Sequence, residues 1–339
     1  MIRPRLPCQV AFLGLLVFGA QVQASDDSVV RQWLDQMSHA LTNLDYQGTV
    51  IYLHDGQLDS IQIVHLVDDD GEHERLTSLN GAPREVIRTR DKVTCILPGK
   101  RSMVLDRRFT NNLFPALPPS QVGDLADFYN FRFIGNDRVA GLTAAVVGIV
   151  PGDSYRYGYR LWLEKDTGML LQSELLNEAG QAVEQLMFTN ITLGESISPS
   201  ALEPRFGEPE FGPKAPPGTK SRTRAKPALA PPHEFRWEAT SLPPGFHLKS
   251  HEWERLSANS PLAEHLVFTD GLATVSVYVE EPSGGPDAPK GGASMGAVSA
   301  FTRQVNDHRI TVVGEVPPLT ARSIANGMHY EGPAVASHD

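Results

Sequence analysis

Short alternating segments separated by turn residues dominate the first half of the chain. Between Gly48 and Asp106, apolar and polar residues alternate in short runs that end at Asp-Gly, Asp-Asp-Gly, Asn-Gly-Ala-Pro and Pro-Gly turns. A period of two is typical of strands with one buried face, and these turn sequences favour tight connections. Similar runs continue from Phe128 to Leu193. Because short connections join antiparallel neighbours, the pattern predicts one large curved antiparallel sheet.

A helix is predicted directly before these strands. Apolar residues recur at helical spacing from Val30 to Leu44, after the capping candidates Asp26, Asp27 and Ser28. One apolar face of such a helix would pack on the sheet. The fold class expected for this part of the chain is therefore α+β.

The first residues have the three parts of a secretory signal. Arg3 and Arg5 precede an apolar run from Val10 to Ala20, and Val22-Gln23-Ala24 is a small-residue cleavage site. The apolar run is shorter than the roughly 20 residues that span a bilayer. We expect cleavage after Ala24 and export, and we expect neither a retained anchor nor lipid on Cys8.

The expected mature chain is acidic and holds one cysteine. The formal charge of the whole chain is −10, and removal of Arg3 and Arg5 makes it −12. This charge, with no basic stripe, argues against nucleic acid as a partner. Cys95 alone remains after cleavage, so no intramolecular disulfide can form, and its strand-like neighbours predict a buried thiol.

A composition change near residue 193 predicts a second, smaller domain. Residues 194–233 are rich in Pro and charge, as in a linker, whereas residues 234–328 again contain strands and a closing helix from Leu319 to Asn326. The predicted organisation is a signal peptide (1–24), a large sheet domain (25–193), a linker (194–233), a small α+β domain (234–328) and a tail (329–339).

Three short motifs resemble catalytic sites, and each has a simpler interpretation. Asp166-Thr167-Gly168 matches the aspartic protease tripeptide, but an aspartic protease needs two such aspartates, and alternating residues on both sides predict a hairpin turn. Gly292 to Gly296 matches the nucleophile elbow G-x-S-x-G, but a Pro- and Gly-rich loop precedes it and no βαβ alternation exists. Leu97 to Ser102 lacks the first glycine of a phosphate loop.

The histidines likewise form no metal-binding pattern. They are scattered, without an H-x₃-H or C-x₂-C pair. The sequence therefore predicts no enzyme, no cofactor and no metal site.

Aromatic residues offer a different kind of site. Tyr and Phe residues are concentrated around residues 128–133 and 155–162, on both faces of the predicted strands. A second layer could cover them, or the concave side of a curved sheet could form an apolar groove. Trp33, on the first helix, could either plug that groove or pack beneath the sheet. The groove candidates are Trp33, Phe128, Tyr129, Phe131, Phe133, Tyr157, Tyr159 and Trp162.

Longer strings in the chain resemble the MucB/RseB family of periplasmic regulators of the envelope-stress sigma factor. They are YQGTVIY (Tyr46 to Tyr52), SLNGAPREVIR (Ser78 to Arg88), the segment from Arg138 to Gly180, LPPGF (Leu242 to Phe246), TDGLATVSVYVE (Thr269 to Glu280) and ITVVGEVPPLTA (Ile310 to Ala321). These strings span nearly the whole expected mature chain, in order. The linker and the tail carry no family motif that we can assign.

The resemblance implies a fold and a function. The large domain would be a half-open barrel with helices, similar to the lipoprotein carriers LolA and LolB. The protein would bind the periplasmic domain of a single-pass anti-sigma factor, shield it from proteolysis, and release it on sensing lipopolysaccharide or mislocalised lipoprotein. A lipid or lipoprotein carrier of the LolA type is the alternative, although such a carrier needs no second domain.

The resemblance also implies two binding surfaces, one for an anionic lipid and one for the anti-sigma factor. An acidic protein that binds an anionic lipid needs a local cationic patch, and consecutive strands supply Arg84, Arg88, Arg90, Lys92, Lys100, Arg101, Arg107 and Arg108, which could equally form a solvated sheet face. The resemblance implies that the small domain contributes much of the anti-sigma contact. The candidates there are Phe246, Tyr278, Val312, Val313, Leu319 and Ile324. The sequence leaves the effector and a homo-oligomer open.

Overall fold

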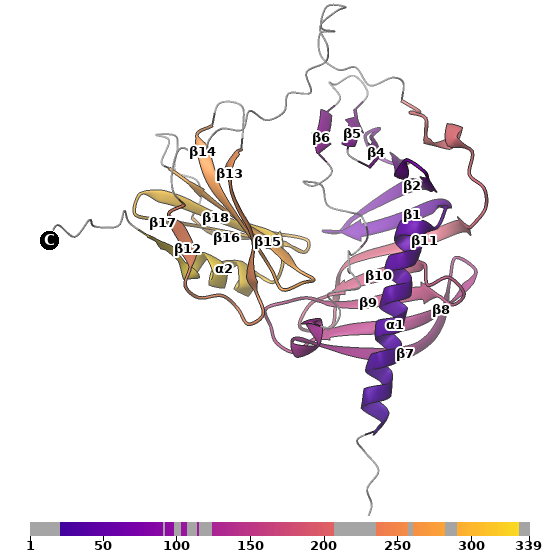
Figure 1. Ribbon diagram of the computed structural model, residues 1–339, viewed down its shortest axis with the longest axis horizontal. Coiled ribbons are helices and arrows are strands. Elements are labelled where there is room, and N and C mark those ends of the chain that lie inside the picture. Colours follow the sequence, from indigo (N-terminus) through magenta and orange to yellow (C-terminus); the bar gives the residue numbers. More distant parts are fainter. Residues whose placement is uncertain are drawn as a thin grey trace, which may run out of the picture.

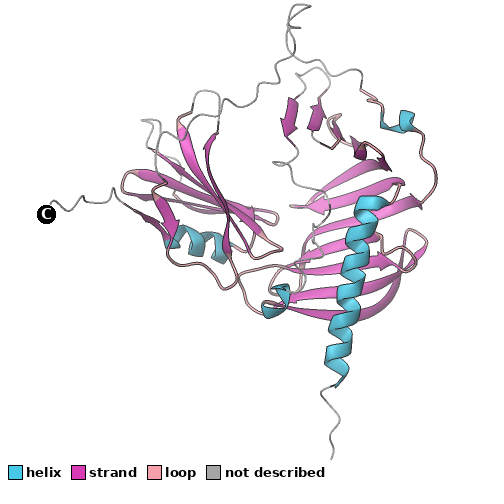
Figure 2. Cartoon of the chain, viewed as in Figure 1, coloured by secondary structure: helices cyan, strands magenta, loops and turns pink. Residues whose placement is uncertain are grey.

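The computed structural model describes residues 21–90, 92–97, 103–106, 114, 124–206, 235–256, 260–281 and 290–331. Two sheet domains make up this part of the chain and contact each other along one side (Figure 1). Strands dominate both domains, and each carries one α-helix among its described residues (Figure 2).

The large domain is a curved antiparallel sheet, as predicted. Its eleven described strands are β1 (Tyr46–His54), β2 (Gln57–Asp68), β3 (Gly71–Ser78), β4 (Glu85–Arg88), β5 (Lys92–Ile96), β6 (Met103–Asp106), β7 (Tyr129–Val139), β8 (Leu142–Pro151), β9 (Gly158–Glu164), β10 (Leu170–Leu176) and β11 (Ala182–Leu193). Their order is β6-β5-β4-β3-β2-β1-β11-β10-β9-β8-β7. The early and late strands join where Tyr46 of β1 pairs with Leu193 of β11.

The helix α1 (Gln21–Asn43) lies across this sheet, as Figure 1 shows. Val30, Leu34 and Met37 are fully buried on it, three to four residues apart, which is the expected one-faced spacing. They join a core cluster with sheet residues such as Phe188 and Leu161. The sequence prediction of a helix packed on the sheet is confirmed.

Residues 194–206 correct the predicted start of the linker, because they pack on the large domain. After β11 the chain forms the short helix η4 (Pro199–Leu202), and Ile197 contacts Val64 and Leu66 of β2. The Arg75 guanidinium donates a 2.7 Å hydrogen bond to the carbonyl oxygen of Glu203. Polar residues in this segment hid these contacts in the sequence.

The small domain is a six-stranded antiparallel sheet with one helix. Its strands are β13 (His247–Arg255), β14 (Leu262–Thr269), β15 (Thr274–Glu280), β16 (Gly291–Met295), β17 (Val298–Val305) and β18 (His308–Glu315), in the order β13-β14-β15-β18-β17-β16. Helix α2 (Pro318–Gly327), close to the predicted closing helix, lies against β17 and β18. Its residues Ala321, Ile324 and Ala325 belong to one core cluster with buried residues of β14, β15 and β18.

A two-stranded pair extends the small domain beyond its predicted end. Strand β12 (Trp237–Ala239) pairs with β19 (Met328–Tyr330), so Trp237 lies opposite Tyr330. Residues 329 and 330, expected in the tail, therefore belong to the domain. Trp237 is buried in the core beside α2. The sequence pattern did not predict its strand, because that strand is only three residues long.

The described helices include none that is both long enough and apolar enough to cross a membrane. Residues 1–20 of the predicted signal peptide lie outside the described residues, and residues 21–24, with the predicted cleavage site, form the start of α1.

Candidate functional site

A pocket of about 560 Å³ opens on the face of the large sheet that α1 covers. Ile61, Phe114 and Leu186 belong both to the pocket wall and to the core cluster that holds α1. The small domain contributes Glu315, at the end of β18. The volume falls within the roughly 300–1,000 Å³ of small-molecule sites.

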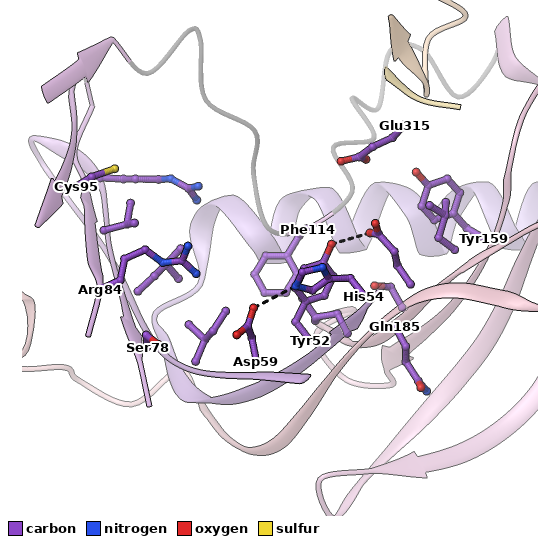
Figure 3. A pocket seen from close by; sticks show the side chains of 18 residues that line it. Tyr52, His54, Asp59, Ser78, Arg84, Cys95, Phe114, Tyr159, Gln185 and Glu315 are labelled. Atoms are coloured by element: carbon purple, nitrogen blue, oxygen red, sulfur yellow. Dashed lines mark hydrogen bonds and ion pairs between the residues drawn. The ribbon is translucent and has the colours of Figure 1, made fainter. Parts of the chain in front are cut away.

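Opposite charges line the two ends of this pocket (Figure 3). Arg84 and Cys95 lie at one end, Tyr159 and Glu315 lie at the other, and the Phe114 ring lies between them. The apolar residues along the wall are Ile61, Leu76, Val86, Phe114, Leu175 and Leu186. An amphiphile with an anionic group matches this arrangement best, because the apolar wall would contact its chain and Arg84 its charge.

Several of the polar groups already have partners. His54 Nε2 lies 3.1 Å from Asp59 Oδ2, and the Arg88 guanidinium donates to Glu74 Oε2 at 2.6 Å. Arg84, by contrast, is exposed and forms no ion pair with the described residues. Arg84 is therefore the cation best placed to bind a ligand.

Two carboxylates from different domains meet at the other end. Glu184 accepts a 2.7 Å hydrogen bond from the Tyr52 hydroxyl and a 3.3 Å hydrogen bond from the backbone N–H of Ala297 in the small domain. Burial and this hydrogen bond raise the pKa of the Tyr52 hydroxyl, which stays protonated as a donor. Although Glu315 keeps contact with solvent, partial desolvation at the domain boundary, followed by repulsion from Glu184, raises the pKa of its carboxyl.

The structure does not bring the eight aromatic candidates into one groove. Only Tyr159 lines the large pocket. Trp33 and Phe133 line a second hollow, of about 390 Å³, between α1 and β7. Phe131 is buried in the core, and Trp162, which points to the opposite sheet face from Tyr159, donates its indole N–H to Asp137 at 2.9 Å.

The remaining three aromatic candidates lie where the two domains meet. Phe128 and Tyr129 surround the guanidinium of Arg156, and Tyr157 packs against Ala297 of the small domain. The aromatic candidates were grouped because they are close in sequence. Strand alternation and the β8–β9 connection give them different contacts.

The basic candidates also separate. Arg84 and Arg88 reach the pocket, although Arg88 is paired with Glu74, while Arg90 and Lys92 are exposed outside it. Lys100, Arg101, Arg107 and Arg108 lie outside the described residues. Cys95, predicted to be buried, is half-buried at the pocket wall.

Three of the six partner candidates in the small domain are core residues. Phe246, Val312 and Ile324 are buried in the cluster beneath α2, so they cannot contact a partner in the folded state. Tyr278 and Val313 alternate with buried neighbours and point to the sheet face away from α2, whereas Leu319 is exposed on α2 itself. Apolar character alone did not distinguish the two sheet faces.

The catalytic motifs have structural roles. Asp166 to Gly168 form the turn between β9 and β10, where Glu164 accepts hydrogen bonds from the N–H groups of Asp166 and Thr167. Gly168 has φ +77° and lies against Gln36 of α1. Ser294 lies within β16 of a β16–β17 hairpin, not at a strand-to-helix turn.

The described residues also lack a candidate metal site. The part of the chain that the structure describes holds no group of three His, Cys, Asp or Glu side chains that could ligate a metal ion.

Comparison with known proteins assigns both domains. The sequence profile of the MucB/RseB N-terminal domain matches residues 29–206, and that of the MucB/RseB C-terminal domain matches residues 231–329. The chain belongs to the MucB/RseB family. The large domain thus extends to residue 206, in agreement with the packing of η4.

Named relatives of this MucB/RseB protein are regulators. It is 33% identical to the sigma factor AlgU regulatory protein MucB of Pseudomonas aeruginosa, over 95% of this chain and 96% of that one. It is 26% identical to the sigma-E factor regulatory protein RseB of Escherichia coli K12, over 94% and 95% of the two chains. These relatives confirm the prediction of a regulatory protein that is not an enzyme.

Solved MucB structures share the fold. The crystal structure of MucB in complex with MucA(peri) matches with a TM-score of 0.68 and 30% identity, covering 90% of this chain and all of that one. A crystal structure of MucB matches with a TM-score of 0.62 and 31% identity, over 90% and 98% of the two chains. The predicted two-domain architecture is confirmed.

Proposed function

We propose that this protein is exported to the periplasm, with cleavage after Ala24, and binds the periplasmic domain of a membrane anti-sigma factor there. Binding shields that domain from regulated proteolysis, and lipopolysaccharide or mislocalised lipoprotein triggers release. The observation that carries the proposal is the match over 90% of the chain to MucB solved with MucA(peri).

The sheet face of the small domain that α2 leaves uncovered is the proposed partner surface. Val267, Tyr278 and Val313 are half-buried there, on three adjacent strands. Aromatic and aliphatic side chains on an open sheet face can bury apolar area of a partner.

The proposed effector site is the pocket, which adjoins this surface. Val313 and Glu315 are two residues apart on β18 and point to the same face, and Glu315 lines the pocket. A ligand that displaces Glu315 would therefore disturb the surface beside it. Partner and ligand then compete through their different preferences for two arrangements of the same strand.

Calorimetric titration tests the partner surface. The purified protein is titrated with the periplasmic domain of an anti-sigma factor related to MucA, and Val313→Glu is compared with the parent. We expect the introduced charge to weaken binding by at least about 100-fold, because an unpaired carboxylate would be desolvated at the contact.

Leu319→Glu is the matched control, since Leu319 is a similarly apolar residue on α2, on the other side of the sheet. Equal affinities of the Val313→Glu variant and the parent would exclude the uncovered face. Absence of binding by the parent, with recovery of acylated lipoproteins instead, would favour the carrier.

A further inference from the structure

A second contact between the domains is centred on Arg156, in the connection between β8 and β9. This arginine is 1% exposed, and its guanidinium bonds to both domains. Nη1 donates to Asp270 Oδ2 of the small domain at 3.0 Å, Nη2 donates to the Pro244 carbonyl oxygen, and Nε donates to Asp153 Oδ1 at 3.1 Å. One side chain of the large domain is thus fixed by two separate turns of the small domain.

Aromatic rings exclude water from this ion pair. The ring centroids of Phe128, Tyr129 and Phe246 lie 4.9, 5.4 and 5.5 Å from the Arg156 guanidinium carbon. The Tyr129 hydroxyl also donates to Asp270 Oδ2, at 2.8 Å. Phe246 comes from the small domain, so the cation lies between rings of both domains. We call Phe128, Tyr129, Arg156, Phe246 and Asp270 the Arg156 cluster.

The geometry of the Arg156 cluster permits one relative orientation of the domains. A guanidinium presents its donors in a rigid plane, so rotation of one domain misaligns several hydrogen bonds at once. Breaking a buried ion pair leaves an uncompensated charge, which is far more costly than losing a surface pair. Rotation of one domain against the other must therefore overcome a distinct barrier.

The Arg156 cluster is mechanically connected to the pocket. Asp270 Oδ1 accepts hydrogen bonds from the N–H groups of Leu272 and Ala273, at 3.0 and 2.7 Å, and so holds the turn between β14 and β15. Strand β15 pairs directly with β18, which ends at Glu315 in the pocket. Fixing Asp270 therefore fixes the position of Glu315 relative to the large domain.

We propose that the Arg156 cluster is a latch that holds the two domains in the orientation that completes the pocket, and that its opening lets the domains rotate. The closed and the open latch supply two domain orientations between which a ligand and a partner can compete, and only this regulatory use rests on the proposed function. Domain rotation can be measured without any partner or lipid.

Distance measurement by electron paramagnetic resonance tests the latch. Spin labels are placed on the mature protein at Glu178→Cys, in the exposed β10–β11 turn, and at Asp307→Cys, in the exposed β17–β18 turn, after Cys95 is replaced by Ser. We expect one narrow distance distribution in this labelled parent. In Arg156→Gln and in Asp270→Asn, which keeps the oxygen that holds the turn, we expect a distribution at least about twice as broad.

Arg160→Gln is the matched control, because the Arg160–Glu174 ion pair lies within the large domain at 2.8 Å. This control should leave the distribution narrow. Distributions in Arg156→Gln and Asp270→Asn as narrow as in the parent would overturn the latch, whatever the affinity for an anti-sigma domain.

Tyr129→Phe is a milder variant that tests the latch if Arg156→Gln and Asp270→Asn do not fold. It removes one hydrogen bond to Asp270 and preserves the ring beside Arg156. An intermediate broadening is expected, and an unchanged distribution in this variant would likewise contradict the latch.

Discussion

The two domains meet at two places of opposite chemical character. Around Arg156 the contact is dry, and a buried cation faces a buried anion, Asp270. At the pocket of about 560 Å³, Glu184 and Glu315 place like charges from the two domains near each other. The contact around Arg156 stabilises one fixed orientation of the domains. The contact at the pocket contributes little to the stability of that orientation.

This difference suggests a division of labour. A pocket whose charges are incompletely matched can be stabilised further by a ligand, while a fully paired contact can only lose stability when it opens. Ligand binding at the pocket and domain rotation at the Arg156 cluster would then oppose each other. Substitutions at each place test this difference.

The largest effect is expected at the buried ion pair. Arg156→Met should lower the free energy of unfolding by about 3–5 kcal/mol, because Asp270 loses its charge partner in a dry environment. Arg160→Met, at a partly exposed ion pair, should cost less than about 1 kcal/mol. Urea unfolding followed by tryptophan fluorescence measures both, and equal losses would show that the Arg156 pair behaves like a surface pair.

The close approach of the domains at Gly245 should give the second effect. Gly245 has φ +81°, and an added Cβ would lie 2.6 Å from the Phe128 ring. Gly180 has a similar φ of +73°, with open space around it. Gly180→Ala should cost about 1–2 kcal/mol through its backbone conformation alone, and Gly245→Ala should cost about 1–3 kcal/mol more through the clash.

Thermal unfolding of the two alanine variants measures this difference. If they are equally stable, the domains are not in contact at Gly245.

At the pocket, Arg84 should control ligand affinity without controlling stability. Arg84→Gln should weaken binding of a short-chain phosphatidic acid about 10-fold, or ~1.4 kcal/mol, because a charge-assisted hydrogen bond is lost. Arg90→Gln, at an exposed arginine outside the pocket, is the control. Titration below the micelle-forming concentration measures the affinity, and equal weakening by both variants would indicate general charge attraction only.

The smallest effect concerns pH. The folded-state pKa of Glu315 is raised, so ionisation of this carboxyl destabilises the folded protein above its ordinary titration range, and the cost disappears as the pH falls. Glu315→Gln should therefore be slightly more stable than the parent at pH 7.5, by less than about 1 kcal/mol, and equal to it near pH 4.

Glu178→Gln, in an exposed turn, is the pH control and should show no such difference. A Glu315→Gln variant that is less stable than the parent at pH 7.5 would mean that Glu315 has a favourable charge partner.

Local features of the fold could be predicted from the sequence. Alternation and turn residues identified the strands, and helical spacing identified α1, because each signal depends on neighbours a few residues apart. The prediction of a turn at Asp166 to Gly168 is also confirmed, and Gly168 has the positive φ that this turn needs. Long strings, rather than single residues, indicated the family.

The candidate site could not be predicted in the same way. Alternation places Val312 and Val313 on opposite faces, but it does not say which face α2 covers, and Val312 is the buried one. Arg156 is separated from Asp270 by 114 residues, and Glu184 of β11 meets Ala297 of another domain. Such contacts depend on how the domains dock, for which a single sequence carries no local signal.

Thermodynamic coupling between partner and ligand tests most directly whether the pocket controls release. Calorimetric titration of the full protein with the anti-sigma periplasmic domain is repeated at saturating phosphatidic acid, and the lipid titration is repeated with the anti-sigma domain bound. We expect each to weaken binding of the other by the same factor, on the order of 10-fold or more, as linkage requires. Two affinities that do not change would contradict a pocket that controls release.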